Sequence, residues 1–266
     1  MATTAAAFFD LDKTIIATSS AFAFGKEFLN SGMITRQEAL EISLAKASYM
    51  WLGQSSEKMD STRDALAQMA AGWRVEDIQK ITTETMRTVV TPAIYAEARE
   101  LIRSHHEAGR EVIIISASAS ILVEPIAREL GVDTVVATEL EVEDGALTGR
   151  VTRYLKGEAK ADAVRRFAAE RGYDLEDSYA YSDSATDIPM LALVGHPVAV
   201  NPDRALKKHA MHSGWGVLSF KNPEPLIAVP NAREVGIGAG ILAAVGAALA
   251  AGFAVTKALR NTKESA

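Results

Sequence analysis

The run Val112-Ile113-Ile114-Ile115 is the feature of this sequence that most narrows its fold. Four consecutive β-branched residues, bounded by Gly109 and Ser116, are typical of a strand that is buried on both faces. Strands of that kind occur in parallel sheets, because the crossover connections between parallel strands place helices over both faces. The run therefore predicts an α/β fold with a parallel sheet at its centre.

Apolar segments alternate with stretches of helical periodicity along most of the chain. Strands are predicted at residues 5–9, 112–115, 134–137, 178–182 and 197–200, and helices at 92–106, 121–130, 159–170 and 188–193. Strands separated by helices indicate a doubly wound, mostly parallel sheet. One local exception is expected at residues 139–151, where Asp144-Gly145 suits the tight turn of a β-hairpin.

A helical block interrupts this alternation early, between the first strand and Pro92. Residues 20–86 carry apolar side chains at helical spacings, and three or four helices are expected there. This position predicts an all-helical cap inserted after the first strand. The expected organisation is a core at 1–18 and 92–222, a cap at 19–91, a linker at 223–234, a transmembrane helix at 235–256 and a tail at 257–266.

The C-terminal segment from Val235 to Thr256 contains no charged residue in 22 positions. At ~1.5 Å per helical residue it would span about 33 Å, which matches the hydrocarbon core of a bilayer. Small residues recur at every fourth position from Gly236 to Gly252, as in helices that pack closely in lipid. Ala and Gly dominate the segment, so insertion is only marginally favourable, and a surface-packed tail is the alternative.

Composition excludes several classes of function. The net charge of −6 and the pI near 5.5 argue against nucleic acid as a partner, because that binding depends on clustered Lys and Arg. Cysteine is absent, which excludes disulfides, thiolate catalysis and Cys-ligated zinc. The N-terminus lacks the basic region of a secretory signal, so a cytoplasmic catalytic domain is expected, with the C-terminal helix as a candidate anchor to the cell membrane.

Polar residues that could take part in catalysis or bind a metal follow three of the predicted strands. They are Asp10 and Asp12, Ser116, and Asp183 with Asp187. Ligands of open parallel sheets bind outside the carboxyl ends of the strands, where these residues are expected to meet. Two carboxylates two residues apart suit a nucleophile paired with a general acid, although taken alone they could equally cap a helix. Asp183 and Asp187 offer the hard oxygen ligands that Mg²⁺ prefers, and Lys160, at the start of a helix, offers positive charge.

Four motifs in order make the chain resemble the haloacid dehalogenase (HAD) superfamily, and within it the phosphoserine-phosphatase-like subclass IB. The motifs are Asp10-Leu11-Asp12-Lys13-Thr14, Ser116 after its strand, Lys160 in Lys156-Gly157-Glu158-Ala159-Lys160, and Asp183 to Asp187. One motif alone is only moderately specific, whereas four in order, each after the expected element, are a strong signal. The resemblance covers roughly residues 5–220.

This resemblance implies a magnesium-dependent phosphatase that acts on a small phosphorylated metabolite or lipid head group. Asp10 would attack phosphorus to form an aspartyl-phosphate, while Asp12 would protonate the leaving oxygen and then activate water. Ser116 and Lys160 would bind the phosphoryl oxygens. Mg²⁺ would be held by the Asp10 carboxylate, the Asp12 backbone carbonyl and the Asp183 carboxylate, with Asp187 as a further ligand or an orienting group.

Departures from the phosphoserine phosphatase pattern leave the substrate open. That enzyme carries a Glu early in its cap that engages the substrate amino group, and Ser19 stands at the corresponding position here. Ser116-Ala117-Ser118 stands where that enzyme has Ser-Gly-Gly, so the backbone near the phosphate is less permissive. Lys156 competes with Lys160 for the phosphate-binding role.

Two other functions fit the same motifs. One is a catalytically silent, membrane-tethered binding or regulatory protein, and the other is a phosphotransferase that passes the phosphoryl group to an alcohol instead of water. His105-His106-Glu107 resembles a metal cluster in the sequence, but adjacent helical residues point in different directions. A helix end before Gly109 is expected to be solvated instead.

Overall fold

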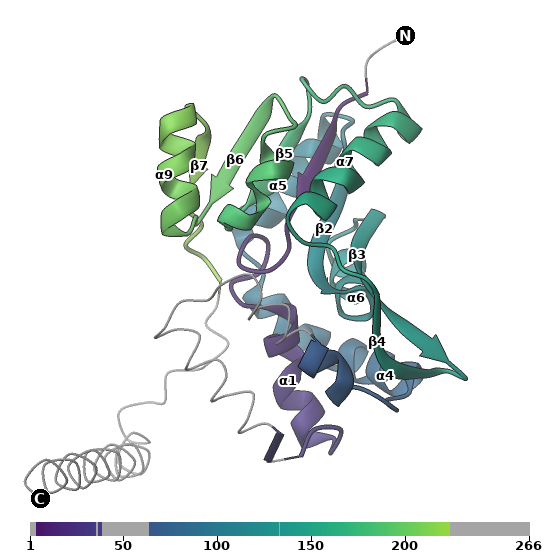
Figure 1. Ribbon diagram of the computed structural model, residues 1–266. Helices are drawn as coiled ribbons and strands as arrows, with labels where there is room; N and C mark the ends of the chain where they lie inside the picture. The colour runs from purple at the N-terminus through teal and green to yellow at the C-terminus, as the bar shows by residue number, and fades with distance from the viewer. Residues whose placement is uncertain (1–3, 36, 39–63, 133, 224–266) are drawn as a thin grey trace, which may run out of the picture. The chain divides into compact units, whose positions relative to one another are not determined.

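The chain folds around one β-sheet (Figure 1). The computed structural model describes residues 4–35, 37–38, 64–132 and 134–223, and all of them belong to the unit Met1–Leu226. The strands of this part are β1 (Ala6–Phe9), β2 (Glu111–Ala119), β3 (Thr134–Glu143), β4 (Ala146–Arg153), β5 (Tyr179–Ser182), β6 (His196–Val200) and β7 (Gly216–Leu218). The helices are α1 (Ser20–Asn30), α4 (Val75–Thr85), α5 (Ala96–Glu107), α6 (Ser120–Glu129), α7 (Glu158–Arg171), α8 (Ile188–Leu191) and α9 (Arg204–Ser213), with a π-helical turn η1 (Met86–Val90) and 3₁₀ turns η2 (Thr91–Ala93) and η3 (Ala185–Asp187).

The strand order in the sheet is β4-β3-β2-β1-β5-β6-β7. Every neighbouring pair is parallel except β3 with β4, which form an antiparallel hairpin. Asp144 and Gly145 turn this hairpin with positive φ angles of 50° and 75°, as the sequence predicts. The predicted α/β fold with a mostly parallel sheet is confirmed.

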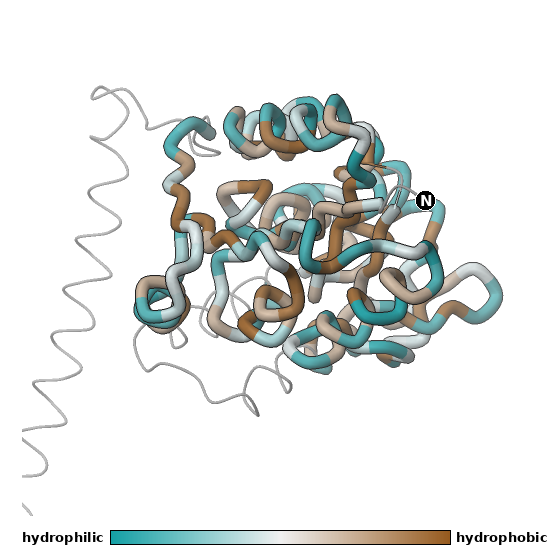
Figure 2. Tube along the Cα trace, turned by 90° about the horizontal axis from the view of Figure 1, so that it is seen from above, coloured by the Kyte–Doolittle hydropathy of each residue, from teal (hydrophilic) through white to brown (hydrophobic). Residues whose placement is uncertain are grey.

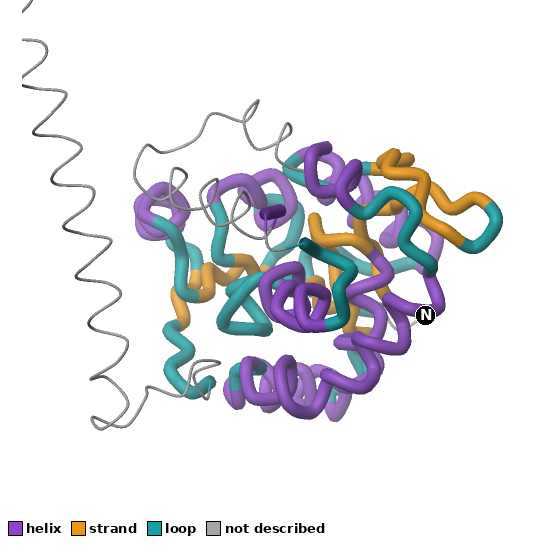
Figure 3. Tube along the Cα trace, turned by 90° about the horizontal axis from the view of Figure 1, so that it is seen from below, coloured by secondary structure: helices purple, strands orange, loops and turns teal. Residues whose placement is uncertain are grey.

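Helices cover both faces of the sheet, because successive residues of the central strands point in opposite directions. On one face, Phe9 and Ile114 belong to a buried cluster that includes side chains of α5 and α6. On the other face, Phe8 and Ile115 pack with side chains of α7, α8 and α9. Figure 3 shows the strands running between helices, and Figure 2 shows hydrophobic and hydrophilic residues alternating along these helices, as expected of helices that bury one side.

Helices α1 and α4 lie beyond the carboxyl ends of the central strands (Figure 1). They pack against each other, and α4 also packs against α6. Phe28 of α1 contacts Trp73, which lies two residues before the start of α4, with ring centroids 5.2 Å apart. Both helices fall in the segment 19–91, but residues 36 and 39–63 lie outside the described part, so the predicted number of helices in that segment stays a prediction.

The segment around Pro92 differs from the sequence prediction. Pro92 lies in the 3₁₀ turn η2 and does not open the following helix, which starts at Ala96. The intervening residues are held extended, because Tyr95 N–H donates to the carbonyl of Ile15 at 2.9 Å and Ala17 N–H donates to the carbonyl of Ala93 at 2.8 Å. Backbone pairing with the segment after β1 therefore delays the helix.

The last part of the sheet was predicted incompletely. The helix predicted at 188–193 ends at Leu191 after about one turn, while α9 and β7 were not predicted at all. The predicted transmembrane helix at 235–256, the tail at 257–266 and the linker beyond residue 223 lie outside the described residues and stay predictions. Of the helices that the structure does describe, none has the length and apolar character needed to cross a membrane.

His105 near the end of α5 is buried, which contradicts the expectation of a solvated helix end, whereas His106 is exposed. Arg110 Nε donates to His105 Nδ1 at 2.7 Å, and His105 Nε2 lies 2.8 Å from the hydroxyl of Tyr181. Nδ1 must therefore carry the lone pair, and the proton sits on Nε2 and is donated to Tyr181. Burial and the positive charge of Arg110 lower the pKa of His105 to about 4.

Acid should weaken the fold through His105. Between about pH 6.5 and pH 4 the unfolded chain binds a proton at this residue that the folded chain does not, so stability is present above this range and falls as pH falls through it. We expect the stability advantage of the wild type over His105→Gln to shrink by roughly 2 kcal/mol from pH 7 to pH 4.5, measured by urea unfolding. The matched variant His106→Gln, at the exposed neighbour, should show no such change; a wild-type advantage over His105→Gln that is independent of pH would contradict the prediction.

Candidate active site

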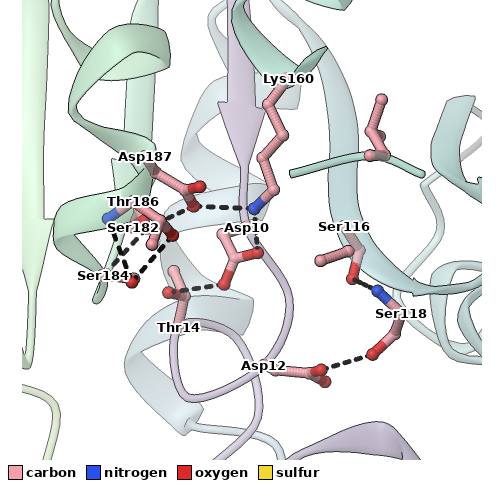
Figure 4. A network of polar contacts seen from close by, with 12 residues as sticks. Asp10, Asp12, Thr14, Ser116, Ser118, Lys160, Ser182, Ser184, Thr186 and Asp187 are labelled. Atoms are coloured by element: carbon pink, nitrogen blue, oxygen red, sulfur yellow. Dashed lines mark hydrogen bonds and ion pairs between the residues drawn. The ribbon is translucent and has the colours of Figure 1, made fainter. Parts of the chain in front are cut away.

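The segment after β1 folds into a tight turn that separates the two acidic side chains of the first motif (Figure 4). The carbonyl of Leu11 accepts hydrogen bonds from the backbone N–H groups of Thr14, Ile15 and Ile16, at 2.9 to 3.3 Å. Lys13 takes a left-handed φ of 61° in this turn, which allows the chain to curl back on itself. The first acidic residue stays in line with the strand, and the second is carried by the turn.

Asp10, Lys160 and Asp187 form a buried chain of hydrogen bonds at the end of β1 (Figure 4). Lys160 Nζ donates to Asp10 Oδ1 at 2.6 Å and to Asp187 Oδ2 at 2.7 Å, and the three side chains are 3% (Lys160), 9% (Asp10) and 2% (Asp187) exposed. Asp187 Oδ2 also accepts from the hydroxyl of Ser182 at 2.7 Å, and Thr14 Oγ1 donates to Asp10 Oδ2 at 3.3 Å. Three segments that are distant in sequence meet here.

The backbone before α7 brings Lys160 into this chain. Gly157 precedes the helix with a φ of +57°, a conformation that residues with a side chain rarely adopt. The turn at Gly157 starts α7, and Lys160 in the first turn of the helix reaches Asp10 from the sheet face that α7 covers. Lys156 lies before this turn and is only half-buried.

Burial and charge together set the protonation of this network. Burial raises the pKa of Asp10 to about 7, against the opposing effect of Lys160, and the carboxylates of Asp187 and Asp183 raise it further. Burial acts to lower the pKa of Lys160, but its two carboxylate partners outweigh that effect and hold the pKa above its usual range. Lys160 therefore stays charged, while Asp10 needs additional positive charge nearby to be fully ionised at neutral pH.

Asp12 is held by different donors, on the side of the turn that faces away from Lys160 (Figure 4). Its Oδ2 accepts the hydroxyl of Ser118 at 2.5 Å, and its Oδ1 accepts the backbone N–H of Ser20, the first residue of α1, at 2.7 Å. Burial raises the pKa of Asp12, and these hydrogen bonds act in the opposite direction. The two acidic residues of the motif thus have separate environments.

Ser116 lies at an irregularity near the end of β2, where the pairing with β3 shifts between Ser116 and Ala119. Its side chain is buried, and its Oγ accepts the backbone N–H of Ser118 at 3.1 Å. Thr138 Oγ1 donates to the carbonyl of Ala117 at 2.7 Å, which fixes the bulge from the β3 side. Because Ser116 accepts a hydrogen bond from the chain, its hydroxyl proton is available for donation to a ligand.

Asp183 follows β5 and is half-buried. Burial raises the pKa of Asp183 to about 6, while the positive charge of Lys13 opposes that rise. Asp203 supports the loop, because its backbone N–H donates to the carbonyl of Asp183 at 2.7 Å. The Asp203 carboxylate also accepts the N–H groups of Ala185, at 2.9 Å, and Leu206, at 2.7 Å.

The ligands that the resemblance implies, the carboxylates of Asp10 and Asp183 and the backbone carbonyl of Asp12, are oxygen donors of the type that suits a divalent cation. Asp183 and Asp187 raise the pKa of Asp10, which is the repulsion that a bound cation would relieve. Asp187 already bonds to Lys160 and Ser182, so it suits the orienting role better than the ligand role. Within the described ranges, no group of three or more His, Cys, Asp or Glu side chains is arranged to hold a metal. The expected ligand set has only two such side chains, Asp10 and Asp183, because its third ligand is the backbone carbonyl of Asp12.

Most residues of this arrangement are predictable from the sequence, but the residues that support them are not. Asp10, Lys160 and Asp187 are in direct contact, while Asp12 and Ser116 are linked to each other through Ser118. Ser118, Ser182 and Asp203 were missed as supporting residues. Each lies within three residues of a predicted element or motif, but small polar side chains near strand ends are too common to be recognised without their partners in space.

The chain is similar to several known proteins. The family model described as haloacid dehalogenase-like hydrolase matches residues 7–192. A probable phosphatase of Mycobacterium tuberculosis is 49% identical over 96% of this chain and 88% of its own length. A phosphoserine phosphatase of the same species is 38% identical over 91% of this chain and 80% of its own length. A histidinol-phosphatase of Neisseria meningitidis is 34% identical over 81% of this chain and 98% of its own length.

Proposed function

Since the chain belongs to the haloacid dehalogenase-like hydrolases, as a phosphatase similar to phosphoserine phosphatases, we propose that it hydrolyses a small phosphomonoester through an aspartyl-phosphate at Asp10. The observation that carries the proposal is the buried chain of Asp10, Lys160 and Asp187, with Asp12 held apart from it. A nucleophile needs to be desolvated and fixed, whereas an acid–base group needs its own environment and pKa.

The reaction divides between these residues in two steps. An oxygen of Asp10 attacks phosphorus and the bond from phosphorus to the ester oxygen breaks, while Asp12 gives its proton to that leaving oxygen. Asp12, now ionised, takes a proton from water, which attacks phosphorus and releases Asp10 as a carboxylate. Lys160 and the hydroxyl of Ser116 would offset the negative charge of the phosphoryl oxygens in both steps.

Mg²⁺ is the proposed cofactor, held by the carboxylates of Asp10 and Asp183 and the carbonyl of Asp12, with Asp187 orienting Lys160. When bound, the ion would supply the positive charge that lets an anionic nucleophile approach an anionic phosphate. Support comes from the raised pKa values of about 7 for Asp10 and about 6 for Asp183, which indicate two acidic groups short of compensating charge.

Residues 19–91 are proposed to act as the cap that selects the substrate over a core of 1–18 and 92–222. Ser19 caps the N-terminus of α1, where its hydroxyl oxygen accepts the backbone N–H of Phe22 at 3.2 Å. A neutral, capping serine provides no carboxylate for the amino group of phosphoserine. The relatives named for phosphoserine and for histidinol phosphate therefore define a range of substrates to test.

Purified protein is expected to hydrolyse p-nitrophenyl phosphate only when Mg²⁺ is present. EDTA should reduce the rate by at least roughly a hundredfold, and excess Mg²⁺ should restore it, because the ion compensates the repulsion between nucleophile and substrate. A panel that contains phosphoserine, histidinol phosphate and phosphorylated lipid head groups would then rank natural substrates by kcat/KM. Full activity after removal of divalent ions would contradict the cofactor proposal, and inactivity toward the whole panel would favour a binding protein instead.

A further inference from the structure

Asp12 is clamped by two donors that come from different parts of the chain. The hydroxyl of Ser118 donates to Oδ2 from the end of β2 (Figure 4). The backbone N–H of Ser20 donates to Oδ1 from the start of α1. One donor on each carboxylate oxygen fixes the plane of the group as well as its position. Of these donors, Ser20 contributes a backbone group that any residue except proline would supply, whereas the other depends on the side chain of residue 118.

We propose that Ser118 is a positioning residue for the proton-transfer group Asp12. This inference rests on the proposed phosphatase function and assigns Ser118 a role that it plays only through Asp12. A hydroxyl is suited to the role because it can donate to Oδ2 whether Asp12 is ionised or carries its proton on a remaining lone pair, so the contact survives both halves of the reaction. Each carboxylate oxygen keeps a second lone pair for the proton that it moves.

Ser118 is itself held in place from the phosphate-binding side. Its backbone N–H donates to the Oγ of Ser116 at 3.1 Å, and the carbonyl of the preceding Ala117 accepts the hydroxyl of Thr138 at 2.7 Å. Thr138 Oγ1 in turn accepts the N–H of Leu155 at 3.2 Å, which ties the bulge to the segment after β4. Ser118 therefore connects Ser116, the proposed phosphate-binding serine, to Asp12, the proposed general acid, and the bulge fixes the distance between them.

The leaving group of the substrate provides a test that a purely structural role would not pass. A leaving oxygen of high basicity needs the proton of Asp12 in the first step, whereas p-nitrophenolate leaves without it. Because kcat/KM reports the first irreversible step, its dependence on the leaving group isolates the acid role from later hydrolysis of the phosphoenzyme. The full-length protein with Mg²⁺ should be assayed on aryl phosphates from p-nitrophenyl to p-methoxyphenyl phosphate.

We expect Ser118→Ala to lose roughly ten- to a hundredfold in kcat/KM with p-methoxyphenyl phosphate but less than about threefold with p-nitrophenyl phosphate. Ser118→Thr, which keeps the hydroxyl, should recover most of the difference. Ser104→Ala is the matched control, because Ser104 is also half-buried but donates to Leu101 within α5. The ratio of the two kcat/KM values does not depend on the active fraction, so partial misfolding leaves it unchanged.

The outcomes separate the two levels of the proposal. Equal losses with all leaving groups in Ser118→Ala, in a wild type that hydrolyses every member of the series, would overturn the role of Ser118 and leave the phosphatase function standing. A wild type that hydrolyses none of them would overturn the phosphatase function itself. A steeper dependence on the leaving group that Ser118→Thr reverses would establish the positioning role.

Discussion

Asp10→Asn is expected to abolish phosphatase activity, with kcat for p-nitrophenyl phosphate reduced roughly 10⁴-fold or more. The amide cannot attack phosphorus as a carboxylate does. Asp187 is the nearest acidic partner in the network, but Lys160 and Ser182 both bind its Oδ2. Replacement of the proposed nucleophile should therefore remove the covalent step.

The proposed covalent intermediate allows a second, independent measurement of the same prediction. Acid quenching of the wild type during turnover of a ³²P-labelled substrate should trap labelled protein. Hydroxylamine should release the label, because an acyl phosphate is a reactive mixed anhydride. Asp10→Asn should carry no label. The matched control is Asp162→Asn on α7, whose carboxylate is 69% exposed and pairs with Arg165. Label that persists in Asp10→Asn would place the nucleophile at another residue.

The sequence predicts that candidate site residues meet at one edge of the sheet, and Asp10, Lys160 and Asp187 do lie in contact. Asp10, Asp183 and Ser116 follow apolar strands, and the carboxyl ends of parallel strands meet at one edge of the sheet. A strand prediction is therefore also a prediction of proximity. Lys160 was harder to assign, since Lys156 fits the spacing too; the positive φ of Gly157 starts α7 between the two lysines, and the turn is visible only in the structure.

Supporting contacts and helix surroundings were less predictable, because they depend on partners that are distant in the sequence. His105 was expected at a solvated helix end, yet Tyr181 from β5 and Arg110 enclose it. Helix α9 carries local signals that could have identified it, namely the N-cap Asp203 and the C-cap Gly214 with a φ of 70°. Ser118 has no local signal of that kind, because its partner Asp12 lies 106 positions away in the chain.

Lys160→Met is expected to produce the largest combined loss of activity and stability. Methionine has a similar length but no charge, so the variant leaves the carboxylates of Asp10 and Asp187 buried without their shared cation. Removal of one partner from a buried ion pair typically costs about 3–5 kcal/mol. Activity should fall by roughly 10³-fold, because the positive charge opposite the phosphoryl oxygens is lost as well.

The pH dependence of this instability identifies its cause. Without Lys160, burial and the repulsion from neighbouring carboxylates would raise the pKa of Asp10 further above its value in the unfolded chain. The folded variant would then bind more protons than the unfolded chain, so its deficit in unfolding free energy should grow as pH rises from about 6 to about 8. Urea unfolding at both pH values would measure this deficit, with Lys207→Met, at an exposed lysine, as the matched control.

Addition of Asp187→Asn to Lys160→Met should restore part of the stability but none of the activity, since it removes one buried charge without replacing the cation beside Asp10. A deficit that is independent of pH, or no recovery in the double variant, would show that packing of the Lys160 side chain, and not its charge, stabilises the site.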